Sequence, residues 1–514
     1  MRILSCNTGS YPASVEQQKY LCFTDDGSLY ISDEYRTNPH VLAYCNELEN
    51  NNVIYKIKYE DTSKVRDIYL LSTDSVAVKN TEIQNEVIEL FKKAKNLNAS
   101  DIHFRIHDGY CLVLFRINGM LEKQTEIVEQ TARQYISTIY QSMCAVADPV
   151  IEWGIPQDAK IKEDFIKDLG LFGARFASRP SVQGYLCVLR LFYGGNELQT
   201  LESLGYLPEQ IMLINKMIKS TDGVVLVCGP TGSGKSTTLQ VIANKIIQKN
   251  HQKINFITIE DPPETPIPGS VQTPLIYDRK DPNSLNIEWT KAIANLMRLD
   301  PDQIMPGEIR DIHGAKACID AAMTGHNVWT TLHTKDPIFA LTRLCNMGID
   351  IDLVTDSSLV IGLIGQRLAR KICYNCKLPY ANGLETIAIE ERLFIEETCE
   401  LKNLYLRNPK GCYHCRYSGF SGRTTIAEVI TTDADFMRSF IQGGARQARE
   451  HWFLNGGVTK NQHMIARINQ GILDPIYASH DICPLDQDKK IFGSQFKKNS
   501  IEKPSSINLD LITG

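Results

Sequence analysis

A short apolar run that leads directly into a glycine-rich loop is the feature that most limits how this chain can fold. The run Val224–Cys228 is followed by Gly229-Pro230-Thr231-Gly232-Ser233-Gly234-Lys235-Ser236, which matches the pattern GxxxxGK followed by Ser or Thr. A helix-compatible stretch, Thr237–Lys249, comes next. A buried strand, a glycine loop and a helix in this order predict a parallel α/β sheet whose loop turns backbone N–H groups toward phosphate.

The polar residues of this loop predict a magnesium nucleotide, ATP, as its ligand. The Lys235 ammonium is expected to neutralise the β- and γ-phosphates, and the Ser236 hydroxyl is expected to ligate Mg²⁺. The predicted nucleotide-binding residues are Gly229, Pro230, Thr231, Gly232, Ser233, Gly234, Lys235, Ser236 and Thr237.

Three later strand-like segments end in acids or in a histidine. Ile257–Ile259 precedes Glu260 to Glu264, Asp302 to Pro306 precedes Glu308, and Val328–Leu332 precedes His333. One such residue alone is more often structural, but ligands of open α/β sheets bind at the carboxyl ends of strands. The order of these segments after the glycine loop therefore predicts a catalytic site. Glu308 is the first candidate to orient an attacking water, Glu264 is the second, and His326 and His333 are candidates to sense the γ-phosphate.

At these residues the sequence resembles the secretion ATPase superfamily, in its type IV pilus assembly and type II secretion branch. The three similar segments are Thr258–Glu264, Arg298–Asp311 and Thr324–Thr334, and the resemblance extends from about Glu82 to Val429. It implies a RecA-like P-loop ATPase core and a ring of six identical subunits. It also implies that nucleotide lies between two domains of each subunit, and that the partner is an inner-membrane platform protein.

A segment before the core resembles the smaller domain of the same family. The similar pieces are Ala99–Phe104, Phe115–Gly119, Pro156–Asp158 and the region from Arg175 to Arg190. The resemblance implies an α+β, PAS-like domain whose arginines, here Arg175 and Arg190, reach toward nucleotide phosphates as arginine fingers. The alternative is that both are surface or ion-paired arginines. Departures from the family at Pro306, Asn118, Ala177 and Tyr185 are expected to tune the rate.

Two CxxC elements predict a metal site. Cys373 and Cys376 form one pair, and Cys412 and Cys415 form the other. Four thiolates at this spacing can close a tetrahedral site, for which Zn²⁺ is suited, and such a closed site braces a subdomain without catalysing. The alternatives are reduced cysteines without metal and, less favoured, a redox pair. In the resembled family this element is typical of assembly ATPases and absent from retraction ATPases, which favours pilus extension.

Composition and charge limit the location and the partners. The longest apolar stretches, such as Val224–Cys228 and Leu359–Ile364, are far shorter than the ~20 residues of a membrane span. Met1–Cys6 lacks the apolar centre of a secretory signal. We therefore expect a cytoplasmic protein that associates with the inner membrane through partners. A formal net charge of −5 offers no general attraction to nucleic acid, which makes nucleic acid an unlikely partner.

The sequence predicts four regions in an α/β chain of 514 residues. They are a partner-docking region at 1–80, an α+β domain at 81–195, an ATPase core at 196–430 with a metal-binding insertion at 371–416, and a helical C-terminal region with a flexible tail at 431–514. Shorter patterns predict strands at 20–23, 53–59 and 68–72, and a helix from Glu82 in which Val87, Leu90, Phe91 and Ala94 share one face. A turn-rich segment beginning at Tyr193 predicts a linker, and the Lys-, Ser- and Asn-rich end from Lys489 predicts a loose tail. The predicted function is an ATPase motor that drives pilin assembly or a related pseudopilus. The alternatives are a nucleic-acid translocase of a conjugation system and a weakly hydrolysing, nucleotide-gated scaffold.

Overall fold

The computed structural model describes residues 3–5, 10–14, 17–51, 53–62, 64–65, 82–145, 151–194, 199–277 and 284–493. The chain divides into two units, Met1–Val87 and Ile88–Gly514. Within the described residues, none of the helices combines the length and the apolar character that crossing a bilayer requires.

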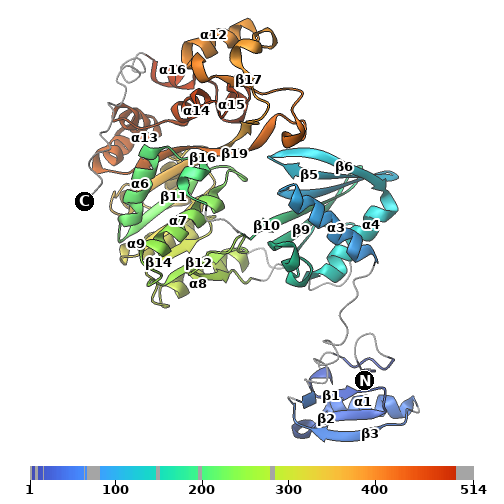
Figure 1. Ribbon diagram of the computed structural model, residues 1–514. Coiled ribbons are helices and arrows are strands. Elements are labelled where there is room, and N and C mark those ends of the chain that lie inside the picture. Colours follow the sequence, from blue (N-terminus) through green and yellow to red (C-terminus); the bar gives the residue numbers. More distant parts are fainter. Residues whose placement is uncertain are drawn as a thin grey trace. The chain divides into compact units, whose positions relative to one another are not determined.

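The first unit contains a small sheet with strand order β1-β2-β3 (Figure 1). Strand β1 (Leu21–Phe23) pairs antiparallel with β2 (Ser28–Ser32), which pairs parallel with β3 (Lys56–Glu60). Helix α1 (Pro39–Asn50) contributes Val41, Tyr44 and Leu48 to a core shared with the apolar residues of β1 and β2. Strands predicted near 20–23 and 53–59 are therefore present in part, and the one predicted at 68–72 lies outside the described residues.

The second unit begins with a seven-stranded antiparallel sheet of order β6-β5-β4-β10-β9-β8-β7. Its strands are β4 (Asp101–His107), β5 (Tyr110–Ile117), β6 (Met120–Val128), β7 (Cys144–Ala145), β8 (Gln157–Ile161), β9 (Leu171–Ser181) and β10 (Gly184–Tyr193). Two helices belong to this region, α3 (Glu82–Asn96) and α4 (Glu129–Thr138). The helical spacing predicted for α3 is confirmed, because Val87, Phe91 and Ala94 are fully buried. Tyr193, predicted to begin a linker, instead ends β10 and donates its hydroxyl hydrogen to Ala99 O at 2.6 Å.

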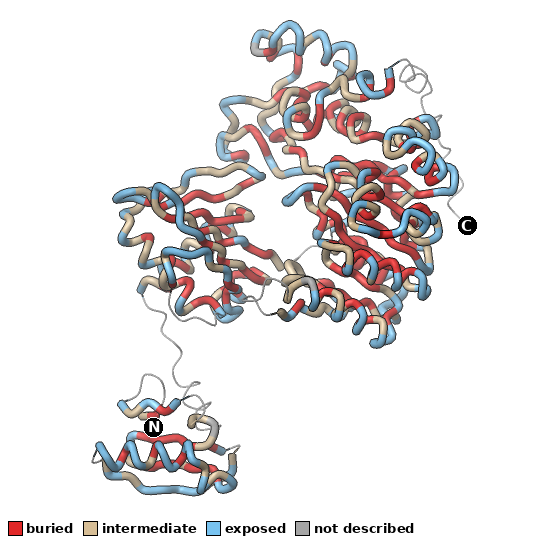
Figure 2. Tube along the Cα trace, turned by 180° about the vertical axis from the view of Figure 1, so that it is seen from behind, coloured by how far each residue is buried: buried red, intermediate tan, exposed pale blue. Residues whose placement is uncertain are grey.

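A second seven-stranded sheet follows, with order β13-β12-β14-β15-β11-β16-β19. Its strands are β11 (Gly223–Cys228), β12 (Phe256–Glu260), β13 (Val271–Pro274), β14 (Gln303–Pro306), β15 (Asn327–Leu332), β16 (Val360–Ile372) and β19 (Phe420–Thr431). The pairings are parallel except between β16 and β19. Figure 2 shows the central strands of this sheet as buried, and β11 and β15 are buried at every residue, as the unbroken apolar runs predict.

Helices cover both faces of this sheet. They are α5 (Leu201–Leu204), α6 (Pro208–Lys219), α7 (Lys235–Lys249), α8 (Ser284–Leu296), α9 (Ile312–Met323), α10 (Phe339–Met347) and α11 (Ile351–Val354). The central strand β11 alternates between two cores: Val224, Leu226 and Cys228 pack with apolar residues of α9, whereas Val225 and Val227 pack with those of α7. Burial on both faces is what positions the loop after β11 rigidly.

An insertion between β16 and β19 and a set of helices after β19 complete the described residues. Strands β17 (Leu378–Pro379) and β18 (Tyr405–Leu406) and helix α12 (Ile389–Thr398) lie in the insertion between β16 and β19. Helices α13 (Ala434–Leu454), α14 (Lys460–Asn469), α15 (Pro475–Asp481) and α16 (Gln487–Phe492) follow β19. The loose tail predicted from Lys489 onward is wrong at its start, because α16 extends to the buried Phe492. Residues 494–514 lie outside the described residues.

Candidate nucleotide site

The phosphate loop connects the carboxyl end of β11 to the first turn of α7. Gly229 has φ 155°, and a Cβ there would lie 2.5 Å from both Gln366 O and Ser233 Oγ. Gly234, the residue before α7, has φ 86°. Side chains other than hydrogen are therefore excluded or strained at these positions, which explains the glycine pattern. Helix α7 begins at Lys235, directly after the loop. The first N–H groups of a helix have no partner within the helix, so this end of α7 is suited to bind an anion.

Lys235 is held inside the loop that precedes it. Its side chain is largely buried, and Nζ donates to Gly229 O at 3.0 Å and to Pro230 O at 3.2 Å. Burial lowers the pKa of Lys235, while the carboxylates of Glu308 and Glu264 oppose that shift. The structure thus brings both candidate acids close to the predicted phosphate-binding lysine. Ser236 and Thr237 follow in the first turn of α7, exposed and half-buried respectively.

A buried polar chain that the sequence analysis missed supports the loop from β16. Gln366 Nε2 donates to Ser233 O at 2.8 Å, and Tyr206 donates its hydroxyl hydrogen to Gln366 Oε1 at 2.7 Å. The Tyr206 hydroxyl also lies 3.2 Å from Thr238 Oγ1 of α7. The loop is therefore held from a strand that is remote in sequence, and this pairing leaves no local signal except a glutamine within an apolar strand.

Glu308, His333 and Arg310 meet at the carboxyl ends of neighbouring strands. His333 Nε2 lies 3.3 Å from Glu308 Oε2, and Arg310 Nε donates to Glu308 Oε1. The other end of the Arg310 guanidinium lies 3.4 Å from Asp261 Oδ2, which follows β12. Burial lowers the pKa of His333, and the charge of Lys235 lowers it further. Glu308 thus accepts contacts on both carboxylate oxygens, which fixes its orientation.

The acids after β12 divide into a buried one and a more open one. Glu260 Oε1 accepts hydrogen bonds from Thr258 Oγ1 at 2.7 Å and from Gln272 Nε2 at 3.0 Å. Burial raises the pKa of Glu260, and the nearby charge of Glu264 also raises it. Glu264 is half-buried and interacts electrostatically with Lys235. Glu264 therefore remains the second candidate acid beside the loop, whereas Glu260 is hydrogen-bonded to side chains of β12 and β13.

Pro306 is the last residue of β14, which lies between β12 and β15 in the sheet. Strand β14 pairs with β15 only at Gln303 and Ile304, so the ladder has ended before Pro306 is reached. The Thr331 hydroxyl instead donates to Gly307 O at 2.7 Å, and Ile309 N donates to Thr331 O at 2.9 Å. These contacts accommodate a residue that cannot donate a ladder hydrogen bond and keep Glu308 beside His333.

His326 lies at the opposite edge of the sheet from the phosphate loop. It precedes the first residue of β15, and its carbonyl oxygen accepts from Gly223 N, at the start of β11, at 3.2 Å. Its Nδ1 lies 3.1 Å from both Thr324 Oγ1 and Ala321 O. Since β15 separates His326 from His333 by about 20 Å at the usual rise per residue, the structure brings only His333 to the site within one chain.

Arg175 and Arg190 lie opposite each other on the paired strands β9 and β10. Arg175 Nε donates to Asp158 Oδ1 at 3.2 Å, and Arg190 Nε donates to Asp101 Oδ1 at 3.1 Å. Their side chains remain 38% and 51% exposed, so both guanidinium groups keep further donors available. Each arginine is ion-paired within its own sheet, and neither belongs to the described residues that line the cavity beside the phosphate loop.

Three other arginines line that cavity, which has a volume of about 290 Å³ and borders the loop residues Pro230 to Ser233. They are Arg367 and Arg370 on β16 and Arg423 on β19. Arg370 is fixed by a two-pronged ion pair with Asp481, with both N–O distances at 2.8 Å. Positive charge beside a phosphate loop suits an anionic ligand. The local signal for these residues is two arginines three positions apart on β16 and a third on the paired strand β19.

The four predicted cysteines come together between β16 and β19. Their sulfur atoms all lie within 4.8 Å of one another, with Cys373–Cys412 and Cys376–Cys415 Sγ distances of 3.8 Å. Four thiolates about 2.3 Å from a zinc ion form a tetrahedron with edges of about 3.8 Å, so the set fits zinc. Burial raises the pKa of the Cys415 thiol, but N–H donors from Cys412 and Gly419 outweigh it and lower the pKa to about 6.

Comparisons with known proteins identify relatives of this chain. The sequence pattern of a family described as "Type II/IV secretion system protein" matches residues 77–475. "Type II secretion system protein E" of Dickeya dadantii is 33% identical over 396 residues, which cover 75% of this chain and 74% of the relative. "Type IV pilus assembly ATPase PilB" of Thermus thermophilus is 32% identical over 391 residues, which cover 76% of this chain and 42% of the relative.

A solved structure shares the fold. The ATPase DotB of Legionella pneumophila is similar over 76% of this chain and 93% of its own, with a TM-score of 0.52 and 20% sequence identity. The family pattern covers most of the chain, including the phosphate loop, the Glu308–His333 pair and the four cysteines. The chain therefore belongs to the type II/IV secretion system ATPase family.

Proposed function

We propose that the chain is a motor that hydrolyses ATP to drive assembly of a type IV pilus or of a related type II secretion pseudopilus. The observation that carries the proposal is the convergence of Lys235, Glu308 and His333 at one edge of the core sheet. The names of the relatives in Dickeya and Thermus, a secretion protein and a pilus assembly ATPase, support the same assignment.

The proposed reaction is in-line attack of water on the γ-phosphate. Lys235 exchanges its contacts with loop carbonyls for phosphate oxygens, and the Ser236 hydroxyl would hold Mg²⁺, which neutralises charge on the phosphates when bound. Glu308, oriented by Arg310 and His333, aligns the attacking water. Glu264 is the alternative acid for this role. The Arg175 and Arg190 guanidinium groups are proposed to act as arginine fingers, which requires them to leave Asp158 and Asp101.

The wider assignment follows the family. We propose a RecA-like core after a PAS-like domain, a ring of six identical chains, a structural zinc at the four cysteines, and a cytoplasmic location beside an inner-membrane platform protein. Closure between the two domains of each chain is proposed to convert hydrolysis into movement of that partner. Residues 1–80 are proposed to dock it.

Turnover by purified rings tests the hydrolytic core of the proposal. We expect Glu308→Gln to lower kcat by about 10²-fold or more with little change in nucleotide affinity, since it removes an interaction of the transition state. Lys235→Ala is expected to weaken nucleotide binding as well. Glu264→Gln is the comparison that decides which acid acts: a larger loss there than in Glu308→Gln reverses the two roles. Hydrolysis stimulated by DNA would favour a translocase instead.

A further inference from the structure

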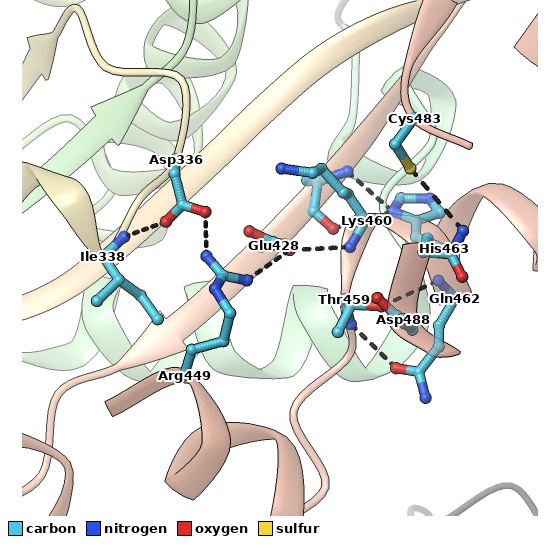
Figure 3. Close-up of polar contacts among 12 residues, drawn as sticks. Asp336, Ile338, Glu428, Arg449, Thr459, Lys460, Gln462, His463, Cys483 and Asp488 are labelled. Atoms are coloured by element: carbon cyan, nitrogen blue, oxygen red, sulfur yellow. Dashed lines mark hydrogen bonds and ion pairs between the residues drawn. The ribbon is translucent and has the colours of Figure 1, made fainter. Parts of the chain in front are cut away.

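The loop that follows His333 is anchored by a residue more than one hundred positions away in the chain. Asp336 in this loop forms an ion pair with Arg449 of α13, and Arg449 Nη1 lies 3.2 Å from Glu428 Oε1 of β19. Figure 3 shows the guanidinium of Arg449 lying between the two carboxylates. One arginine therefore joins the loop, the last strand of the sheet and a C-terminal helix.

The three charged groups are shielded from solvent. Exposed fractions of the side chains are 13% for Arg449, 16% for Asp336 and 2% for Glu428. Burial strengthens ion pairs and makes an unpartnered charge costly, so this arrangement tolerates few alternative geometries. The same Glu428 oxygen accepts from Lys460 N at 3.2 Å, which ties the start of α14 to the group (Figure 3).

Asp336 transmits this anchoring to the loop backbone. Its Oδ1 accepts from Ile338 N at 2.9 Å, and its carbonyl oxygen accepts from Thr334 Oγ1 at 2.9 Å. The backbone N–H of Thr334 also donates to Leu332 O, the last residue of β15, at 3.1 Å. His333, the neighbour of Thr334, lies 3.3 Å from Glu308. Arg449 is thus connected through Asp336 and Thr334 to His333 and, through His333, to the Glu308 carboxylate.

We infer that Arg449 is a positioning residue of the hydrolytic site, acting through Asp336 on the loop that carries His333. This inference rests on the proposed role of Glu308 in hydrolysis. Among the described residues, the polar partners of the Arg449 side chain are Asp336 and Glu428, and not the phosphate loop or Glu308. Arg449 therefore acts on the placement of His333 and Glu308. Its loss is expected to lower kcat and to leave nucleotide affinity unchanged.

The test compares Arg449→Gln with Arg446→Gln in full-length rings. Arg446 lies on the same helix and pairs with Glu450, but its side chain is 89% exposed. We expect Arg449→Gln to lower kcat at least about tenfold with KM for ATP changed less than about twofold. Hydrogen exchange of the peptide covering 333–341 is expected to accelerate, because Asp336, which accepts from the Ile338 amide, is no longer held in place by the ion pair with Arg449. Arg446→Gln is expected to change neither quantity.

Asp336→Asn keeps the test decisive if Arg449→Gln fails to fold, because it leaves the Arg449–Glu428 pair and an acceptor for Ile338 in place. We expect the same selective loss of kcat, and the double variant is expected to be no worse than the stronger single one. Wild-type kcat and unchanged exchange in a folded Asp336→Asn chain would overturn the inference and leave the proposed function standing. If wild-type rings do not hydrolyse ATP, the proposed function is contradicted. The exchange experiment would then still test whether Arg449 holds the loop through Asp336.

Discussion

At the scale of single residues, the C-terminal region holds a histidine whose burial makes stability depend on pH. His463 is fully buried: Ala427 N donates to its Nδ1 at 3.0 Å, and Nε2 lies 2.9 Å from Gly205 O. The neutral ring with its proton on Nε2 satisfies both contacts. Burial and the charge of Arg467 lower the pKa of His463 to about 4, whereas an unfolded histidine titrates near 6.5.

The sign of the pH effect follows from these two values. Between pH 6.5 and 4 the unfolded chain binds more protons at this residue, so stability falls as the pH is lowered through that window. Titration of His463 thus lowers the free energy of unfolding by about 2 kcal/mol at pH 5 relative to pH 7. Buried Asp488, with its pKa raised to about 6, titrates with the opposite sign in an overlapping range, so a comparison of two proteins is needed.

We therefore predict that the stability difference between wild type and His463→Asn shrinks by about 2 kcal/mol from pH 7 to pH 5. Asparagine can accept from Ala427 N but does not titrate. Denaturant unfolding at the two pH values measures this difference. An equal difference at both values would show that His463 does not titrate in this range.

At the scale of elements, the insertion between β16 and β19 has little apolar core of its own. Strands β17 and β18 contain two residues each, and Leu406, Leu404 and Cys399 pack into a cluster shared with α14 and α15. The four clustered sulfur atoms link the two ends of the insertion, beside a hydrogen bond from Cys373 N to Gly419 O at 2.9 Å. A closed metal site of this kind contributes directly to folding.

We predict about one zinc ion per chain by metal analysis, and its loss in Cys376→Ser and Cys412→Ser. Removal of zinc is expected to make residues 373–419 susceptible to limited proteolysis, because the knuckles lose their link. Cys399→Ser is the matched control, since Cys399 is also buried in this region but lies outside the cluster. Zinc retained in Cys376→Ser and Cys412→Ser would contradict a four-cysteine site.

At the scale of the whole molecule, the two units have separate cores. The first unit is built on a cluster that includes Leu21, Phe23 and Tyr44, and the residues of that cluster all come from the first unit. The site residues and the two clusters of the core sheet belong to the second unit. Separate cores permit separate folding.

We predict that a chain beginning at residue 82, where α3 starts, folds and keeps basal ATP turnover within about twofold of the full chain. Binding to the membrane partner is expected to be lost, because residues 1–80 are proposed to provide it. Turnover and partner binding are measured on the same preparations. A folded but inactive shortened chain would show that the first unit contributes to the hydrolytic site.

Local sequence determined the phosphate loop, the helical spacing of α3 and the pairing of CxxC elements. Each is set within a few residues by backbone geometry, side-chain period or ligand spacing. The acids after β12 and β14 were also predicted, because strand ends in a parallel sheet share one edge. The same local reasoning did not separate His326 from His333. His326 precedes β15 and His333 follows it, so the two histidines lie at opposite edges of the sheet.

Only the tertiary structure decided which distant side chains meet. Gln366 supports the carbonyl of Ser233 across 133 positions, and Arg449 pairs with Asp336 across 113. Neither contact has a periodic or compositional signal, because each depends on how strands and helices pack after they have formed. The sequence by itself therefore determined the chemistry available to this protein, and packing determined which groups hold that chemistry in position.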